Sequence, residues 1–247
     1  NTLYVVSVLF ISAPYHTEAV AWVSGRTDLA VSLLMTGSLC TFIRASKNSS
    51  HYYRNITYYS SLCLFILSLL AKESAVVLPV IVLLWNLISK KHRTENRYPL
   101  FAVVPFFLVD IAYLAFKFIS SASIKYISGY YLVTPQSPDF VPYILKKFVF
   151  TFLGLAYCVP VDPLYGIPFL ESHMPATIFA FLFASVVTVI IIVHSNNPKN
   201  SLFVFLWFLI SLLPILPLVS AERTLYFPSV PFLYITGIFW DKYLFQS

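Results

Sequence analysis

The chain has 247 residues, of which 59% are hydrophobic and 11% charged, and its mean hydropathy is +0.80. About a quarter of the residues of a soluble domain are charged, so this composition excludes an ordinary soluble enzyme and predicts an all-α, polytopic integral membrane protein. The formal charge of +6 comes from basic residues that cluster in short segments, which favours membrane lipid rather than nucleic acid as a partner.

The cysteines and the start of the chain give two further expectations. Cys40, Cys63 and Cys158 lie in apolar runs without metal-ligand spacing, so we expect small buried hydrophobic residues and neither a metal site nor a disulfide. The sequence opens at Asn1 inside an apolar run, without an initiator methionine or a leader pattern. We therefore expect an internal piece of a longer protein.

A polar segment, residues 14–28, separates the first two apolar runs. The runs, Leu3–Ala13 and Leu29–Ile43, are expected to be membrane-buried helices, so the segment should lie at their shared non-cytoplasmic end. Charged side chains are costly in lipid, and this segment is either a functional site or a turn whose charges cap the helices and pair with each other. Its polar residues of interest are His16, Glu18, Arg26 and Asp28.

Two basic segments, Arg44–Asn55 and Ser89–Arg97, set the predicted sidedness. Both are expected to be cytoplasmic loops by the positive-inside rule. The run between them, Ile56–Ile88, exceeds one span of about 20 residues, which predicts two helices that turn at Lys72 and Glu73. This turn is expected on the same side as the first polar segment, either in a site or as a local ion pair between helix ends.

The middle of the chain is predicted to hold one full span. Leu100–Ser120 is long enough to cross the membrane, with a bend at Pro105. Asp110 is an intramembrane acid that makes either a polar contact inside the bundle, which is the favoured interpretation, or a contact in helix packing.

Residues 121–173 are then expected to form an outer-side loop and interfacial region. Within it, Phe148–Val159 is too short to span comfortably and is expected to re-enter or to lie along the interface. Asp162, between two prolines, is either a turn former or a site residue.

The last third of the chain contains three more apolar segments. Pro175–His194 and Ser201–Leu218 are expected to span, and Val230–Trp240 to lead back from an outer turn. Pro214 and Pro217 are expected to bend the helix before that turn. The turn contains Glu222, Arg223 and Tyr226. The whole chain, 1–247, is predicted to be one domain of about eight transmembrane helices and one re-entrant or interfacial segment.

The predicted sidedness gathers the charged turns on one membrane face. Their arginine and lysine side chains suit a phosphate, and their carboxylates suit an acceptor hydroxyl. The alternative is a structural ion-pair network that closes the end of the bundle. The sequence contains no glycine-rich phosphate loop, zinc pattern or serine-histidine-aspartate order, and nothing in it requires a metal.

Four motifs, in this order along the chain, resemble a known family. They are PYHTEAVAWVSGRTD at 14–28, AKE at 71–73, PVD at 160–162 and AERTLYFPS at 221–229. They are similar to the signatures of the transmembrane and tetratricopeptide-repeat (TMTC) proteins and their prokaryotic relatives, in the GT-C glycosyltransferase superfamily. The resemblance extends over nearly the whole chain, and the first and last motifs give most of its specificity.

The resemblance implies a GT-C-like bundle that transfers a sugar from a polyprenyl-phosphate carrier to a protein hydroxyl on the lumenal or periplasmic side. In eukaryotic members the sugar is mannose and the carrier is dolichyl phosphate. The lipid-linked sugar and the protein acceptor are the implied partners. The resemblance places His16, Glu18, Arg26, Asp28, Lys72, Glu73 and Asp162 in the outer-side site, and Glu222, Arg223 and Tyr226 near the carrier phosphate.

Two features of that family have no counterpart in this sequence, namely its acidic pair in the first large outer loop and its tetratricopeptide repeats. The catalytic residues are therefore unknown, and the acidic pair is expected upstream of Asn1. The residues of the first motif favour prokaryotic relatives, and therefore a plasma membrane. If the protein is eukaryotic, the endoplasmic reticulum membrane is expected instead. A transporter or flippase, and a non-catalytic membrane scaffold, are the alternative functions.

Overall fold

The computed structural model describes residues 2–48, 55–89, 100–121, 136–157, 171–195, 197–217 and 222–245. These residues lie in helices and turns, without a strand among them, so the all-α prediction is confirmed. The chain folds as two compact units. Unit 1 contains Asn1–Arg26 and Gly129–Ser247, and unit 2 contains Thr27–Ser128. The single domain predicted over 1–247 stays a prediction.

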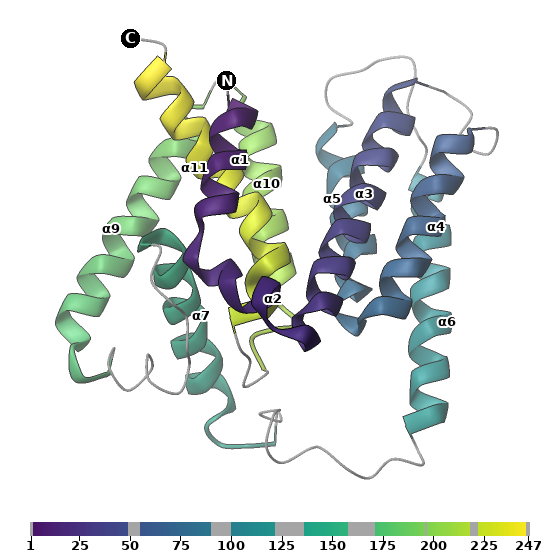
Figure 1. Cartoon of the computed structure of the whole chain (residues 1–247), viewed down its shortest axis with the longest axis horizontal. Helices are drawn as coiled ribbons and strands as arrows, with labels where there is room; N and C mark the ends of the chain where they lie inside the picture. Colours follow the sequence, from purple (N-terminus) through teal and green to yellow (C-terminus); the bar gives the residue numbers. More distant parts are fainter. Residues whose placement is uncertain are drawn as a thin grey trace. The chain divides into compact units, whose positions relative to one another are not determined.

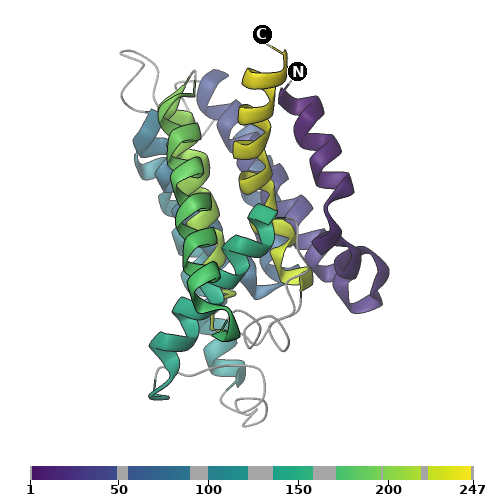
Figure 2. The ribbon, with the colours of Figure 1, turned by 90° about the vertical axis from the view of Figure 1, so that its left-hand side faces the viewer.

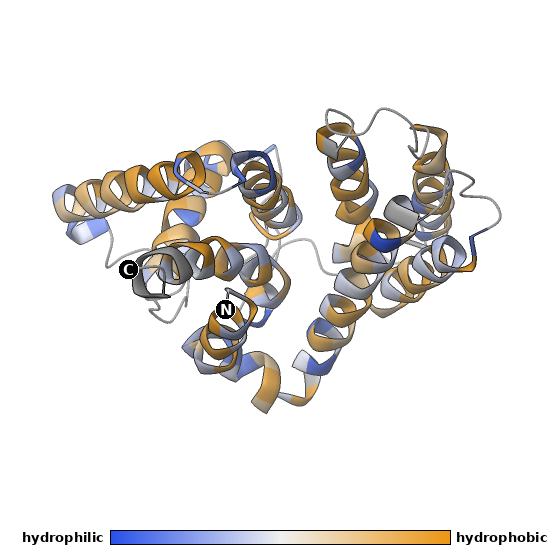
Figure 3. Cartoon of the chain, turned by 90° about the horizontal axis from the view of Figure 1, so that it is seen from above, coloured by the Kyte–Doolittle hydropathy of each residue, from blue (hydrophilic) through white to orange (hydrophobic). Residues whose placement is uncertain are grey.

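Four helical stretches among the described residues are long and apolar enough to cross a membrane. A bent pair of helices, Thr2–Ser12 and Pro14–Ala21, meets at 61° and makes a fifth if it is counted as one span. Hydrophobic residues occur along most of each helix (Figure 3). These helices are compatible with a multi-pass membrane protein, and the count of eight spans stays a prediction. The four candidate spans are Arg26–Ser46, Leu100–Ser120, Phe140–Tyr157 and Met174–Val193.

In unit 1 the first and last helices of the chain lie side by side. α1 (Thr2–Ser12) packs against α11 (Tyr226–Phe245), which also packs against α10 (Pro198–Leu212). The start of α1 and the end of α11 lie at the same end of the unit in both side views (Figures 1 and 2). Gly237 permits this approach, because a Cβ atom there would collide with the side chain of Val6.

One phenylalanine joins four helices in the core of unit 1. Phe152, on α7 (Phe140–Tyr157), lies 5.5 Å from the ring of Phe181 on α9 (Met174–Val193). Its ring is also 6.3 Å from Phe208 on α10 and 6.0 Å from Phe232 on α11. Such aromatic pairs contribute about 0.5–1.5 kcal/mol each beyond the area they bury.

The described residues of unit 2 form four helices and two short 3-10 segments. Its core is built around Phe106, whose ring lies 5.7 Å from Phe42, 6.1 Å from Tyr58 and 5.5 Å from Phe65. The elements are α3 (Arg26–Asn48), α4 (Ile56–Ala71), η4 (Glu73–Val77), α5 (Leu78–Ser89), η6 (Leu100–Ala102) and α6 (Val104–Ser121).

A reciprocal pair of serine hydrogen bonds ties α3 to α4. The Ser38 hydroxyl donates to the Ser61 carbonyl at 2.7 Å, and the Ser61 hydroxyl donates to the Ser38 carbonyl at 2.7 Å. Both residues are fully buried. Small polar residues of this kind let two apolar helices approach closely and bond to each other without help from water.

The predicted turn between the two helices of 56–88 is confirmed. α4 ends at Ala71, Lys72 is extended with φ −163° and ψ 143°, and η4 begins at Glu73. Asp110 is buried in α6, as expected for an acid that faces the bundle, but its Oδ1 has no hydrogen-bond partner among the described residues.

The predicted start of the apolar segment Phe148–Val159 is wrong. α7 begins at Phe140 and runs for 18 residues through Lys146 and Lys147, which makes it a candidate span, whereas the residues before Phe148 are predicted above as part of an outer-side loop and interfacial region. The helix continues because Lys147 is buried and its ammonium group donates to the Ile215 carbonyl at 3.1 Å. A lysine that finds a partner in this way no longer marks the end of a span.

Proline positions also differ from the prediction. Pro105 is the second residue of α6, where its missing N–H is tolerated, so it does not bend the helix from within. Pro214 and Pro217 do not bend a long helix, because α10 already ends at Leu212 and residues 213–217 form turns.

One helix boundary and the burial of two cysteines also differ from the prediction. α3 extends to Asn48, so the loop predicted from Arg44 starts later. Cys40 and Cys63 are exposed, not buried, because their helices are apolar on several faces and hydrophobicity alone does not identify the inner one. Cys158, Asp162 and the basic residues 90–97 lie outside the described residues.

Candidate functional site

The first motif folds into three short helical segments in succession. η1 (Pro14–His16) begins after an extended Ala13, α2 (Thr17–Ala21) follows, and η2 (Val23–Gly25) comes after an extended Trp22. Pro14 suits the start of a helical turn because it has no N–H to leave unpaired. Gly25 lies so close to α2 that a Cβ atom on it would be 2.7 Å from the backbone oxygen of Ala19.

His16 fastens this motif to α11. Its Nδ1 lies 2.7 Å from the Phe10 carbonyl oxygen, and its Nε2 lies 2.7 Å from the hydroxyl of Ser229. The imidazole packs among aromatic rings, 4.2 Å from Phe10 and 4.5 Å from Tyr226 between ring centroids. His16 is only 5% exposed, so both ring nitrogens are engaged inside the protein.

The hydrogen-bond partners assign one proton of His16. A carbonyl oxygen only accepts, so Nδ1 carries a hydrogen. The Ser229 hydroxyl has one hydrogen to donate, and both Nε2 of His16, at 2.7 Å, and the Tyr226 carbonyl, at 2.8 Å, lie within its reach. Burial lowers the pKa of His16 below its usual range, while the bond to the Phe10 carbonyl raises it by less. The neutral ring is therefore favoured in Pro14–Ala21, the part of the bent pair that follows the 61° break.

Glu18 connects the first motif to the last one. Its Oε2 accepts from the backbone N–H of Arg223 at 3.1 Å, and its Oε1 lies 4.0 Å from Nη1 of the same arginine. Arg223 belongs to η7 (Glu222–Leu225), which leads directly into α11. The side chains of Glu18 and Arg223 are 22% and 32% exposed, so the pair is reachable from outside.

A shallow, open hollow of about 580 Å³ lies beside Glu18. Glu18 lines it together with Thr17, Trp22 and Val23. Trp22 and Val23 are 60% and 70% exposed. A partly exposed carboxylate beside an arginine and an apolar rim can orient a hydroxyl while the cation attracts an anion.

A second polar cluster lies in unit 2. Lys72 forms an ion pair with Asp28, whose side chain is 6% exposed and which belongs to the first turn of α3. Glu73 pairs with Lys117 at 3.7 Å, with both side chains at least half exposed. An acid in the first turn of a helix is favourable on its own, so these contacts match the structural alternative of ion pairs between helix ends.

The predicted site residues thus fall into separate groups. Unit 1 brings together His16, Glu18, Arg223 and Tyr226, although the two motifs are about 200 residues apart in sequence. Arg26 is exposed at the start of α3, and Glu222 begins η7. Asp28, Lys72 and Glu73 belong to unit 2, and Asp162 lies outside the described residues.

Sequence reasoning missed two partners of His16. Ser229 lies within the last motif, three residues after Tyr226 on the same helix, which was a usable signal for a shared face. Phe10 is part of a continuous apolar run, and nothing in the sequence indicated that its carbonyl contacts His16. Among the described residues, no group of three or more histidine, cysteine, aspartate and glutamate side chains could hold a metal ion.

Comparisons of the chain with protein-family models, with curated proteins and with solved structures found no match.

Proposed function

We propose that this chain is the membrane part of a glycosyltransferase that moves a mannose-like sugar from a polyprenyl- or dolichyl-phosphate carrier to a serine or threonine hydroxyl of a protein. The proposal starts from the resemblance of the four sequence motifs to the TMTC-like transferases. The single structural observation that supports it is the contact between Glu18 and Arg223, which joins the first and last of these motifs in one accessible cluster.

The chemistry of transfer fits this cluster. When the sugar leaves its carrier, the carrier phosphate gains negative charge, which a nearby guanidinium stabilises with paired hydrogen bonds. Glu18 holds Arg223 through its backbone N–H and leaves the arginine side chain a third exposed. The carrier tail would stay in the bilayer while its headgroup meets a soluble acceptor at the interface. The general base that the acceptor hydroxyl needs is unassigned.

The test is sugar transfer by the full-length protein with Arg223 replaced. Arg223→Ala should lower transfer from a polyprenyl-phosphate sugar by about 100-fold or more, the loss typical of removing a group that stabilises developing charge. Arg223→Lys should retain part of the activity, because it keeps the charge and loses the paired geometry. Arg44→Ala, an exposed arginine on α3, is the matched control and should transfer normally. Normal transfer by Arg223→Ala would remove this residue from the proposed phosphate site.

A transporter or flippase is the second candidate, favoured by the 61° break between α1 and the helical turns that follow. Broken helices are common around transporter substrate sites. Purified protein in vesicles distinguishes the two functions. A transferase consumes the lipid-linked sugar only when an acceptor protein is present, whereas a flippase moves it between leaflets without one.

A further inference from the structure

We propose that a groove between α7 and α9 binds one acyl chain of phosphatidylethanolamine, with its zwitterionic headgroup on the Lys146–Glu171 ion pair. This lipid is distinct from the sugar carrier, and the inference does not depend on the proposed function.

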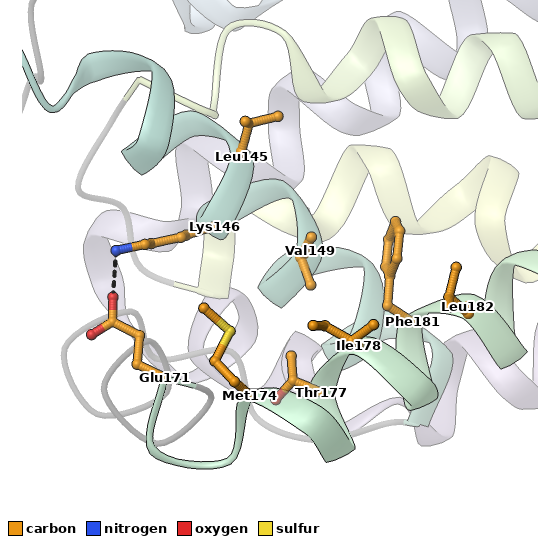
Figure 4. A pocket seen from close by; sticks show the side chains of 9 residues that line it. All are labelled: Leu145, Lys146, Val149, Glu171, Met174, Thr177, Ile178, Phe181 and Leu182. Atoms are coloured by element: carbon orange, nitrogen blue, oxygen red, sulfur yellow. Dashed lines mark ion pairs between the residues drawn. The ribbon is translucent and has the colours of Figure 1, made fainter.

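The groove is an apolar channel within unit 1. It has a volume of about 230 Å³, and α7 contributes Leu145 and Val149 to its wall. Its α9 wall is a stripe at helical spacing, formed by Met174, Ile178, Phe181 and Leu182 (Figure 4). Thr177 adds little polarity, because its hydroxyl is turned back to the His173 carbonyl at 3.1 Å.

The groove wall is exposed to the surroundings of the protein. Leu145 is 60% exposed, Ile178 54% and Leu182 57%. Because α7 and α9 are both candidate membrane spans, a hydrocarbon chain is the occupant that such a wall can accept.

The polar end of the groove selects the headgroup. Lys146 Nζ lies 2.7 Å from Glu171 Oε1, and the two side chains are 47% and 45% exposed (Figure 4). Glu171 comes just before α9 begins, which is where a lipid headgroup meets a spanning helix. A neutral pair of opposite charges complements a phosphate next to a cation, and it offers no net attraction to a purely anionic headgroup.

The ammonium of phosphatidylethanolamine is the better match than that of phosphatidylcholine. A primary ammonium donates hydrogen bonds to a carboxylate such as Glu171, while a trimethylated nitrogen has no hydrogen to donate. The phosphate of the same lipid accepts from Lys146. The expected order of binding is therefore phosphatidylethanolamine before phosphatidylcholine and phosphatidylglycerol.

Native mass spectrometry of the full-length protein, with equal amounts of the three lipids carrying identical chains, tests the proposal. Phosphatidylethanolamine adducts should exceed those of each other lipid by about fivefold, the factor that one exposed ion pair is worth. Lys146→Glu should abolish this preference, and the double exchange K146E/E171K should restore it. Ile178→Trp, which fills the groove, should remove the adduct, whereas the matched control Phe183→Trp, on an exposed α9 residue that does not line the groove, should keep it.

Other outcomes overturn the inference. Equal retention of the three lipids would show that the ion pair does not distinguish between their headgroups. Preferential binding of a polyprenyl phosphate, lost in Lys146→Glu, would make the groove a carrier site instead. Lys146 and Glu171 are half exposed, so their variants test the headgroup even if Ile178→Trp fails to fold.

Discussion

At the scale of single residues, His16 should make the stability of the protein depend on pH. Burial lowers its pKa in the folded protein, so the unfolded chain binds more protons as the pH falls through about 6.5. Its contribution is therefore complete above that pH and is lost as the pH decreases toward the lower, folded pKa. We expect the thermal midpoint in detergent to drop between pH 7.5 and 5, and His16→Gln to reduce this drop.

His16→Gln should also lower the stability of the protein at neutral pH. Removing the imidazole takes the side-chain partner from the Phe10 carbonyl, while the Ser229 hydroxyl keeps its bond to the Tyr226 carbonyl, and this costs about 1–3 kcal/mol. The control is His194→Gln, at the exposed end of α9. It should change neither the stability at neutral pH nor the dependence of the thermal midpoint on pH. An unchanged pH dependence in His16→Gln would contradict the assignment of a neutral, buried ring.

Sequence reasoning at this scale identified polar turns but not the pairs inside them. Glu18 had Arg26 as its nearest cation along the chain, yet its carboxylate contacts Arg223, 205 residues away. Asp28 was grouped with His16 in one motif, yet its partner is Lys72. Pairing across such separations depends on how helices pack, and a single sequence contains no direct signal for it.

At the scale of elements, glycines mark where backbone segments approach each other. A methyl group on Gly25 would be 2.7 Å from the backbone oxygen of Ala19, which cannot move aside. On Gly237 it would be 2.3 Å from Cγ2 of Val6, and a branched valine side chain has one strongly preferred rotamer in a helix. We expect Gly25→Ala and Gly237→Ala each to destabilise the protein by about 1–3 kcal/mol, as overpacking does.

Thermal unfolding of Gly25→Ala and Gly237→Ala measures the loss of stability in each variant. Gly37→Ala on α3 is the matched control, because its nearest neighbour would be Leu64 Cδ1 at an ordinary 3.5 Å. It should be neutral or slightly stabilising, since alanine favours a helix over glycine. Equal midpoints for all three variants would mean that the fold of the first motif does not require Gly25.

The elements themselves were predicted well where apolar runs are uninterrupted. Met174–Val193 and the turn at Lys72 follow the prediction closely, because length and a single polar break decide them. The first part of α7 was missed because the residues before Phe148 were interpreted as part of an outer-side loop and interfacial region. The carbonyl of Ile215 that accepts from Lys147 comes from a distant turn, so the burial of this lysine was not visible in the local sequence.

At the scale of the whole molecule, the ion pairs and the chain connectivity predict membrane sidedness. The contact of Glu18 with Arg223 puts the first and last motifs at one end of unit 1, and the pair of Asp28 with Lys72 does the same for two helix ends of unit 2. Gly25 and Arg26 are consecutive along the chain, so we expect the motif and the start of α3 on one membrane side. Arg44 lies almost at the other end of α3, so it should face the opposite side.

Single cysteines in a background free of native cysteines test this sidedness with a membrane-impermeant maleimide. Thr17→Cys and Glu73→Cys, both at exposed positions, should react from the same side, and Arg44→Cys should react only from the other side. Permeabilised membranes should label all three, which controls for buried thiols. If Thr17→Cys and Glu73→Cys reacted from opposite sides, the charged turns could not serve one lipid-linked substrate, and the transferase proposal would lose Lys72 and Glu73 from its site. If they react together, the carrier phosphate and the acceptor can approach the same surface, because the lipid confines its headgroup to that interface.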